Sequence, residues 1–285
     1  MGLKLQIDNY GLSYLAEGNS SNPTILFLHG FMGDLSEFKQ VIAILSKQFY
    51  CVAIDLLGHG QTRVIDPKTD QDDYYTIQST ANFVIKFLDL LRVNRCFLVG
   101  YSMGGRLALY LTIHFPQYFC RTILESASAG LQTAQERGDR VAKDQLLAAK
   151  LEAGDFRLFL ENWYQQPIFA SLRSHPNFDQ MLEQRLNNSP VLLAKSLRNL
   201  STGMQPSLWE KLPENQIPLL LLAGELDPKF VQINRQMQQL CKYSQLEVIP
   251  SCGHNIHFEN SDLFVEKIKA FCSYSCSQSY YWSLD

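Results

Sequence analysis

A serine lies at the centre of a glycine-flanked motif, Gly100–Gly104, with the sequence Gly-Tyr-Ser-Met-Gly. The motif follows an apolar run at 95–99 and precedes an amphipathic stretch at 106–114. This order predicts a strand, a tight turn and a helix, which is the context of a nucleophile elbow. Glycines permit the turn, and the helix start supplies oriented backbone N–H groups. Ser102 is therefore a candidate for nucleophilic or acid–base chemistry.

A serine hydroxyl at neutral pH needs a partner that takes its proton. Asp227 follows the apolar run 219–223, and His254 follows the run 246–249. Because functional groups gather beyond the carboxyl ends of parallel strands, these side chains are expected to meet Ser102. The order serine, acid, histidine predicts a catalytic triad of Ser102, Asp227 and His254. Glu225, two positions before Asp227, is the rival acid.

A reaction that develops negative charge on an oxygen also needs hydrogen-bond donors near the serine. Phe31 follows the strand-like run 24–28 through His29 and Gly30. In this arrangement a loop N–H faces the nucleophile. We therefore predict an oxyanion hole made by the backbone N–H groups of Phe31 and Met103, with His29 as a structural residue of the loop.

The elements that must position these residues alternate along the chain. Strand-like runs that are nearly continuous in apolar residues lie at 24–29, 50–55, 95–100, 121–125, 218–224 and 245–249. Helical patterns separate them, which predicts an α/β fold with a mostly parallel central sheet and helices on both faces. Residues 131–210 contain no convincing strand and read as a helical lid inserted between two strands. The core is then 1–130 together with 211–285.

Composition excludes several classes of protein. Hydrophobic residues make up 46% of the 285 residues, so a large core can be buried. Lys and Arg (25) are outnumbered by Asp and Glu (28), which argues against a nucleic-acid surface. No apolar run approaches the roughly 18 residues that span a bilayer. We expect a soluble, cytoplasmic protein without membrane contact, whose seven cysteines are reduced.

Arg106 indicates the charge of the ligand. It lies four positions after Ser102, one helical turn further along the same face. A guanidinium in this position favours an anionic substrate, because it can pair with a carboxylate through two hydrogen bonds. Lys229, two residues past Asp227, would add a second cation near the same edge of the sheet.

These residues carry a resemblance to a known family. The chain resembles the α/β-hydrolase superfamily from about Leu12 to Phe271. Within it, the chain is similar to the MenH family, the 2-succinyl-6-hydroxy-2,4-cyclohexadiene-1-carboxylate synthases of menaquinone and phylloquinone biosynthesis. The matching stretches are Gly100–Arg106, Gly130–Gln132, Glu136–Arg137, Arg140, Trp163–Phe169, Gln205–Trp209, Gly224–Phe230 and Gly253–Glu259.

The resemblance implies a lyase that eliminates pyruvate from a small polycarboxylate, without a metal or an organic cofactor. Ser102 would act as the base, activated by His254 and Asp227. The substrate-binding residues implied by the resemblance are Tyr101, Arg106, Gln132, Arg137, Arg140, Trp163, Arg185 and Lys229. Protein partners are not indicated.

Two other functions stay open. One is a carboxylesterase or C–C bond hydrolase in which Ser102 forms an acyl-enzyme. The other is a non-catalytic receptor that uses the pocket of the fold. The complete set of Ser, Asp and His argues against the receptor, and Arg106 argues against an esterase for neutral, lipophilic esters.

Overall fold

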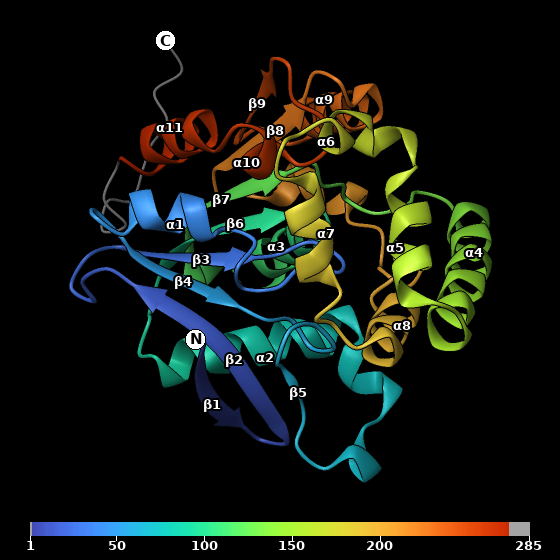
Figure 1. The fold of residues 1–285 in the computed structure, drawn as a ribbon. Coiled ribbons are helices and arrows are strands. Elements are labelled where there is room, and N and C mark those ends of the chain that lie inside the picture. Colours follow the sequence, from blue (N-terminus) through green and yellow to red (C-terminus); the bar gives the residue numbers. More distant parts are fainter. Residues whose placement is uncertain (1, 274–285) are drawn as a thin grey trace.

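The computed structural model describes residues 2–273. Their centre is a nine-stranded sheet with the order β1-β2-β4-β3-β6-β7-β8-β9, in which β5 pairs with β2 (Figure 1). The strands are β1 (Leu3–Ile7), β2 (Tyr10–Glu17), β3 (Thr24–Leu28), β4 (Tyr50–Ile54), β5 (Arg63–Val64), β6 (Cys96–Tyr101), β7 (Phe119–Glu125), β8 (Leu219–Gly224) and β9 (Ser244–Ile249). All pairs from β4 to β9 are parallel. The mostly parallel sheet expected from the sequence is confirmed.

The antiparallel end of the sheet was not predicted. Strands β1 and β2 pair antiparallel, and β2 pairs antiparallel with both β4 and β5. Most side chains of β1 and β2 are exposed or half-buried, in contrast to the five buried residues of β3. Strands at such an edge mix polar and apolar residues, so they lack the continuous apolar run that marks the central strands.

Helices cover both faces of the sheet, as expected (Figure 1). One face packs against α1 (Lys39–Leu45) and α11 (Ser261–Cys272), and the other against α2 (Ile77–Leu90), α3 (Met103–His114) and α9 (Pro228–Leu240). Side chains alternate between the two faces along each strand. In β3, for example, Leu26 belongs to the core on the α3 side and Phe27 to the core on the α1 side.

A group of helices lies between β7 and β8 in the chain, at the right of Figure 1. They are α4 (Ala134–Ala153), α5 (Phe156–Tyr164), α6 (Ala170–Arg173), α7 (Phe178–Arg185) and α8 (Pro190–Asn199). We call residues 131–210 the lid. Its helices share an apolar core of their own, to which Met32 from the loop after β3 also belongs. A capping box between Thr133 and Glu136 begins α4, which satisfies N–H groups at its amino end.

The two ends of the lid are joined by hydrogen bonds. The backbone N–H of Leu208 donates to the carbonyl of Ala129 at 2.8 Å, and the indole N–H of Trp209 donates to the carbonyl of Gly130 at 2.8 Å. The chain therefore leaves the sheet and returns to it at nearly the same place.

The remaining helices are short. They are α10 (Ile256–Glu259) and the 3-10 helices Pro67–Thr69, Asp72–Tyr75, Pro116–Tyr118, Pro167–Phe169 and Trp209–Glu214. Within residues 2–273, no helix combines the length and the apolar character that crossing a membrane requires.

The prediction of reduced cysteines holds for part of the chain. Five described cysteines are buried free thiols: Cys51, Cys96, Cys241, Cys252 and Cys272. Cys120 is disulfide-bonded, so the prediction is wrong at that position.

Candidate active site

Ser102 lies at the carboxyl end of β6, directly before α3. Its backbone has φ 50° and ψ −105°, a left-handed conformation that is costly for a residue with a side chain. The turn also requires close packing against β3: a Cβ atom on Gly104 would lie 2.2 Å from the carbonyl oxygen of Leu28. The glycine motif thus allows a strained turn that presents the Ser102 hydroxyl beyond the sheet.

The imidazole of His254 lies between Ser102 and Asp227. Its Nε2 atom is 3.1 Å from Ser102 Oγ, and its Nδ1 atom is 2.7 Å from Asp227 Oδ2. The side chains of His254 and Asp227 are almost completely buried. The geometry allows His254 to take the hydroxyl proton while the carboxylate orients the ring and stabilises its protonated form.

Further contacts hold Asp227 and His254 in place. Asp227 caps α9 by accepting a hydrogen bond from the backbone N–H of Phe230. The His254 ring packs edge-on against the rings of Tyr101, Phe169 and Phe230. Capping and aromatic packing therefore restrict the orientation of both the carboxylate and the imidazole.

The structure does not bring the rival carboxylate into this group. Glu225 is exposed, and its Oε2 atom accepts a hydrogen bond from the backbone N–H of Ser251 at 3.1 Å. Of the two acids weighed from the sequence, the one hydrogen-bonded to His254 is Asp227.

Phe31 and Met103 line the same cavity as Ser102. Among the described residues, no backbone carbonyl accepts a hydrogen bond from the N–H of either residue. Met103 is the first residue of α3, where the helix dipole favours negative charge. Both N–H groups are therefore available to a ligand atom held beside Ser102.

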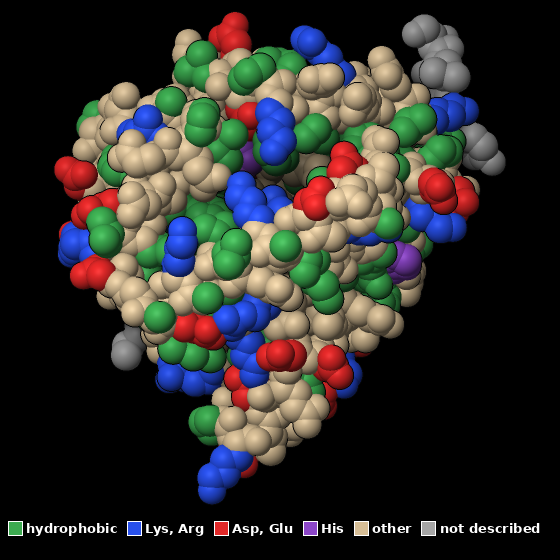
Figure 2. Space-filling view, turned by 90° about the vertical axis from the view of Figure 1, so that its right-hand side faces the viewer, with side chains coloured by type: hydrophobic (Ala, Val, Ile, Leu, Met, Phe, Trp, Pro, Cys, Tyr) green, Lys and Arg blue, Asp and Glu red, His purple; other side chains and the backbone are tan. Residues whose placement is uncertain are grey.

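A cavity of about 560 Å³ extends from Ser102 beneath the lid. Its lining contains four cationic side chains, Arg106, Arg140, Lys143 and Lys229, and a single carboxylate, that of Glu136. Figure 2 views the molecule from the lid side and shows Lys and Arg side chains gathered beside a hollow in this face. The excess of cations favours a ligand with several negative charges.

Arg106 is the cation closest to Ser102 in the chain. Its guanidinium donates to Gln205 Oε1 at 2.8 Å and to the carbonyl of Leu200 at 2.9 Å. In the described part of the chain no carboxylate pairs with it. Burial, with repulsion from Arg140, lowers the pKa of Arg106 to about 9. Burial thus destabilises the charged form, and binding of an anion would stabilise it.

Four of the other residues predicted to bind substrate also line the cavity: Gln132, Arg140, Trp163 and Lys229. The Nε atom of Arg140 pairs with the buried carboxylate of Asp144 at 2.7 Å, which leaves other guanidinium donors for a ligand. Trp163 packs edge-on against Phe31, so it also forms part of the apolar contact between lid and core.

The structure places the remaining three predicted residues outside the cavity lining. Tyr101 is buried behind His254. The guanidinium of Arg137 donates to the carbonyls of Leu131 and Gln132, which fixes the loop before α4. Arg185 forms a buried ion pair with Glu37. Their contacts assign these three side chains to holding the protein around the site.

Sequence reasoning missed several residues of the site. Lys143 and Glu136 line the cavity from α4 together with Arg140. These three are spaced by four and three residues and share one helix face, which is the signal that could have identified them. The buried pair of His257 and Glu125, with 2.7 Å between Nδ1 and Oε2, lies outside the cavity lining and had no such signal, because its members are far apart in the sequence.

Comparison with known proteins agrees with this geometry. A family model described as the alpha/beta hydrolase fold matches residues 23–261. The 2-succinyl-6-hydroxy-2,4-cyclohexadiene-1-carboxylate synthase of Serratia proteamaculans is 33% identical over 258 residues, which are 90% of this chain and 96% of that protein. The chain belongs to this synthase family, the MenH family, within the α/β-hydrolase fold.

Two further comparisons support membership of the MenH family. The solved structure of MenH from S. aureus has a TM-score of 0.85 and 34% sequence identity, with 94% of this chain and 98% of that chain covered. The chloroplastic protein PHYLLO of Arabidopsis thaliana is 32% identical over 273 residues. This match spans 90% of the present chain but only 16% of PHYLLO.

Proposed function

We propose that the protein is a lyase that eliminates pyruvate from 2-succinyl-5-enolpyruvyl-6-hydroxy-3-cyclohexene-1-carboxylate. The product is 2-succinyl-6-hydroxy-2,4-cyclohexadiene-1-carboxylate, an intermediate of menaquinone or phylloquinone biosynthesis. The observation that carries the proposal is the cavity at Ser102, which contains four cationic side chains and one carboxylate. The names of the MenH-family relatives agree with it.

The proposed reaction begins with transfer of the Ser102 proton to His254, which Asp227 orients. The serine oxygen then removes the ring proton next to the succinyl carbonyl. The released electron pair moves through the ring double bond and breaks the C–O bond to the enolpyruvyl group. The leaving group takes up a proton and becomes pyruvate, and the ring, which had one double bond, now has two conjugated double bonds.

Removal of the ring proton places negative charge on the succinyl carbonyl oxygen. The N–H groups of Phe31 and Met103 are proposed to hold this charge. Arg106, Arg140, Lys143 and Lys229 would pair with the substrate carboxylates, none of which is on the reacting carbon itself. Binding energy from these charge pairs then positions the ring proton against Ser102.

The test is to incubate the purified protein with the cyclohexene substrate and to measure pyruvate through lactate dehydrogenase and NADH oxidation. We expect one pyruvate per substrate consumed and none with the Ser102→Ala variant. Consumption of substrate without pyruvate, or no turnover by the wild-type protein, would contradict the proposal. The cytoplasmic location expected from the sequence stays a prediction.

A further inference from the structure

The loop between β3 and α1 carries Phe31, whose N–H is the proposed oxyanion donor from this side. The residues on both sides of Phe31 are bonded to side chains from elsewhere in the chain, Gly30 through its N–H and Met32 through its carbonyl. Gly30 precedes it and Met32 follows it, and Met32 has a left-handed backbone with φ 64°. The Gly30 carbonyl, which shares a peptide group with the Phe31 N–H, accepts hydrogen bonds from the Gly33 N–H at 3.0 Å and from His29 Nδ1 at 2.8 Å. The direction of the Phe31 N–H therefore depends on how the loop on both sides of Phe31 is held in place.

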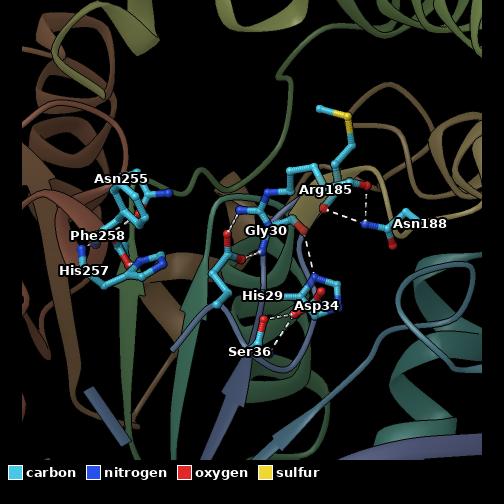
Figure 3. Close-up of polar contacts among 12 residues, drawn as sticks. His29, Gly30, Asp34, Ser36, Arg185, Asn188, Asn255, His257 and Phe258 are labelled. Carbon is cyan, nitrogen blue, oxygen red and sulfur yellow. Dashed lines mark hydrogen bonds and ion pairs between the residues drawn. The ribbon is translucent and has the colours of Figure 1, made fainter. Parts of the chain in front are cut away.

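Gly30 is held through a buried carboxylate. Its backbone N–H donates to Glu37 Oε2 at 2.8 Å, and the other carboxylate oxygen pairs with the guanidinium of Arg185 (Figure 3). The side chains of Arg185 and Glu37 are only 7% and 2% exposed. Arg185 is the last residue of the lid helix α7. One carboxylate thus joins the lid to the residue before Phe31.

Met32 is held by the lid directly. The side-chain amide of Asn188 donates to the Met32 carbonyl at 3.0 Å and to the carbonyl of Arg185 at 3.2 Å (Figure 3). Its Oδ1 atom accepts from the backbone N–H of Gly60 at 2.8 Å. The Asn188 side chain is buried. Arg185, through Glu37, and Asn188 therefore hold the Gly30 N–H and the Met32 carbonyl, one residue before and one residue after Phe31.

This arrangement leaves no room for a side chain at Gly33. A Cβ atom there would lie 2.4 Å from Glu37 Oε2 and 3.1 Å from an Nη atom of Arg185. Any larger residue at position 33 would displace the carboxylate or the guanidinium. The position of the Glu37 carboxylate is thus fixed by close packing against Gly33 as well as by its hydrogen bonds.

We propose that Glu37, Arg185 and Asn188 are positioning residues that keep the Phe31 N–H directed at the oxyanion as long as the lid is seated on the core. This inference rests on the oxyanion role given to Phe31 under the proposed function. In this proposal Arg185 acts on the oxyanion hole indirectly, through Glu37, and it is not a ligand of the substrate. Seating of the lid then completes the catalytic arrangement, so that the serine acts only beneath a seated lid.

The experiment compares wild-type protein with Glu37→Gln, Arg185→Gln, Asn188→Ala and the double variant Glu37→Gln/Arg185→Gln. Glu183→Gln is the matched control, because Glu183 lies on the same helix α7 and pairs with Arg157 at the surface. Each protein is assayed for kcat and KM of pyruvate release, and for the rate at which a neutral fluorophosphonate labels Ser102. Circular dichroism and thermal unfolding check that each variant is folded.

We expect kcat to fall by about 10–100-fold in the three single variants, with KM changed less than about threefold, because a displaced oxyanion donor acts mainly on the transition state. Labelling of Ser102 should slow in parallel, since the phosphoryl oxygen occupies the same hole. The double variant should lose about as much as the worse single variant, because both changes break one connection. Glu183→Gln should stay within about twofold of wild type.

The proposal is overturned if folded Glu37→Gln and Asn188→Ala keep wild-type kcat and labelling rates. It is also overturned if Arg185→Gln raises KM about tenfold or more and leaves labelling unchanged, which is the behaviour of a substrate ligand. Should Glu37→Gln fail to fold, Asn188→Ala decides the question alone. Wild-type labelling without pyruvate release would overturn the proposed function only. Wild-type pyruvate release with unchanged kcat in the folded variants would overturn the positioning role only.

Discussion

The guanidinium of Arg106 donates a hydrogen bond to Oε1 of Gln205, 2.8 Å away, across the junction between the core and the lid. This neutral acceptor orients the guanidinium without cancelling its charge. The remaining charge faces a cavity that already contains three further cations. Arg106 is therefore held in position for an anion that none of the residues 2–273 provides.

Arg106→Ala should lower kcat/KM for the polycarboxylate substrate by about a hundredfold or more, because truncating one partner of a desolvated charge pair costs roughly 2–5 kcal/mol. Arg106→Lys should rescue only part of the loss, since a point charge cannot reproduce the guanidinium fork. The measurement is steady-state kinetics of pyruvate release. Gln205→Ala, which keeps the cation, is the control and should cost much less.

A second assay in the same preparations separates recognition from folding. Hydrolysis of p-nitrophenyl acetate, a neutral ester, should be nearly unaffected by Arg106→Ala if this side activity is detectable. Equal losses on both substrates would show that Arg106 is structural.

Ser102→Ala should lower kcat by several orders of magnitude with little change in thermal stability, because the turn depends on its glycines more than on the hydroxyl. A serine that acts as a base forms no acyl-enzyme. Intact-mass analysis of the wild-type protein during turnover should therefore find no covalent adduct. An adduct that carries a fragment of the substrate would favour an esterase or C–C bond hydrolase.

Asp227→Asn should impair catalysis strongly and leave the fold intact, because the amide cannot stabilise the protonated imidazole or fix its tautomer. Glu225→Gln should have a small effect, since Glu225 is exposed and bonds to the Ser251 backbone. Comparing kcat of the two variants is the measurement. A larger loss in Glu225→Gln would mean that the other carboxylate is the catalytic acid.

Arg140→Ala and Lys143→Ala should each raise KM for the polycarboxylate by about tenfold, because both side chains contribute positive charge to the cavity. Higher ionic strength should raise KM of the wild-type protein in the same direction. Arg137→Ala is the matched control on the same helix, and it should leave KM within about twofold. If Arg137→Ala raised KM as much as Arg140→Ala, the assignment of Arg137 to the loop before α4 would be wrong.

His59 should make stability depend on pH. Burial, with repulsion from His29 and Arg185, lowers the pKa of His59 well below 6.5. Below about pH 6.5 the unfolded chain binds a proton that the folded protein does not, so the free energy of unfolding should fall as pH decreases. The slope from this group approaches about 1.4 kcal/mol per pH unit.

Urea unfolding at several pH values between 5 and 8 measures this slope. A His59→Gln variant should show a flatter dependence over the same range, because it lacks the titrating group. An equal slope in both proteins would show that another residue causes the acid destabilisation.

The central strands were predictable because each is covered on both faces. Residues 24–28 and 219–224 are buried throughout, and burial of this kind leaves an apolar run that is visible in the sequence. Strands β1 and β2 leave no such run, since their outer side chains meet water. A continuous apolar run therefore indicates that a segment is buried, and it identifies a strand only when the strand is buried on both faces.

The residues proposed to react were easier to predict from the sequence than the residues that hold the site in place. Ser102, Asp227 and His254 each follow a strand, and the fold alone brings strand ends together. Arg185 carries the same charge as Arg106, yet its side chain turns to Glu37, which is 148 positions earlier in the chain. Only tertiary packing decides whether such an arginine faces a ligand or a buried carboxylate.

The hydrogen bonds from Leu208 to Ala129 and from Trp209 to Gly130 close the lid segment at its base. These two hydrogen bonds bring the ends of the segment together, so β7 and β8 are joined as if by a short connection, whatever the length of the chain between them. The entropy of closing a long connection grows only slowly with its length. The segment from 131 to 207 can therefore vary in length at a small entropic cost, and a chimaera that keeps this base together with Arg185 and Asn188 could acquire a different substrate pocket above an unchanged serine.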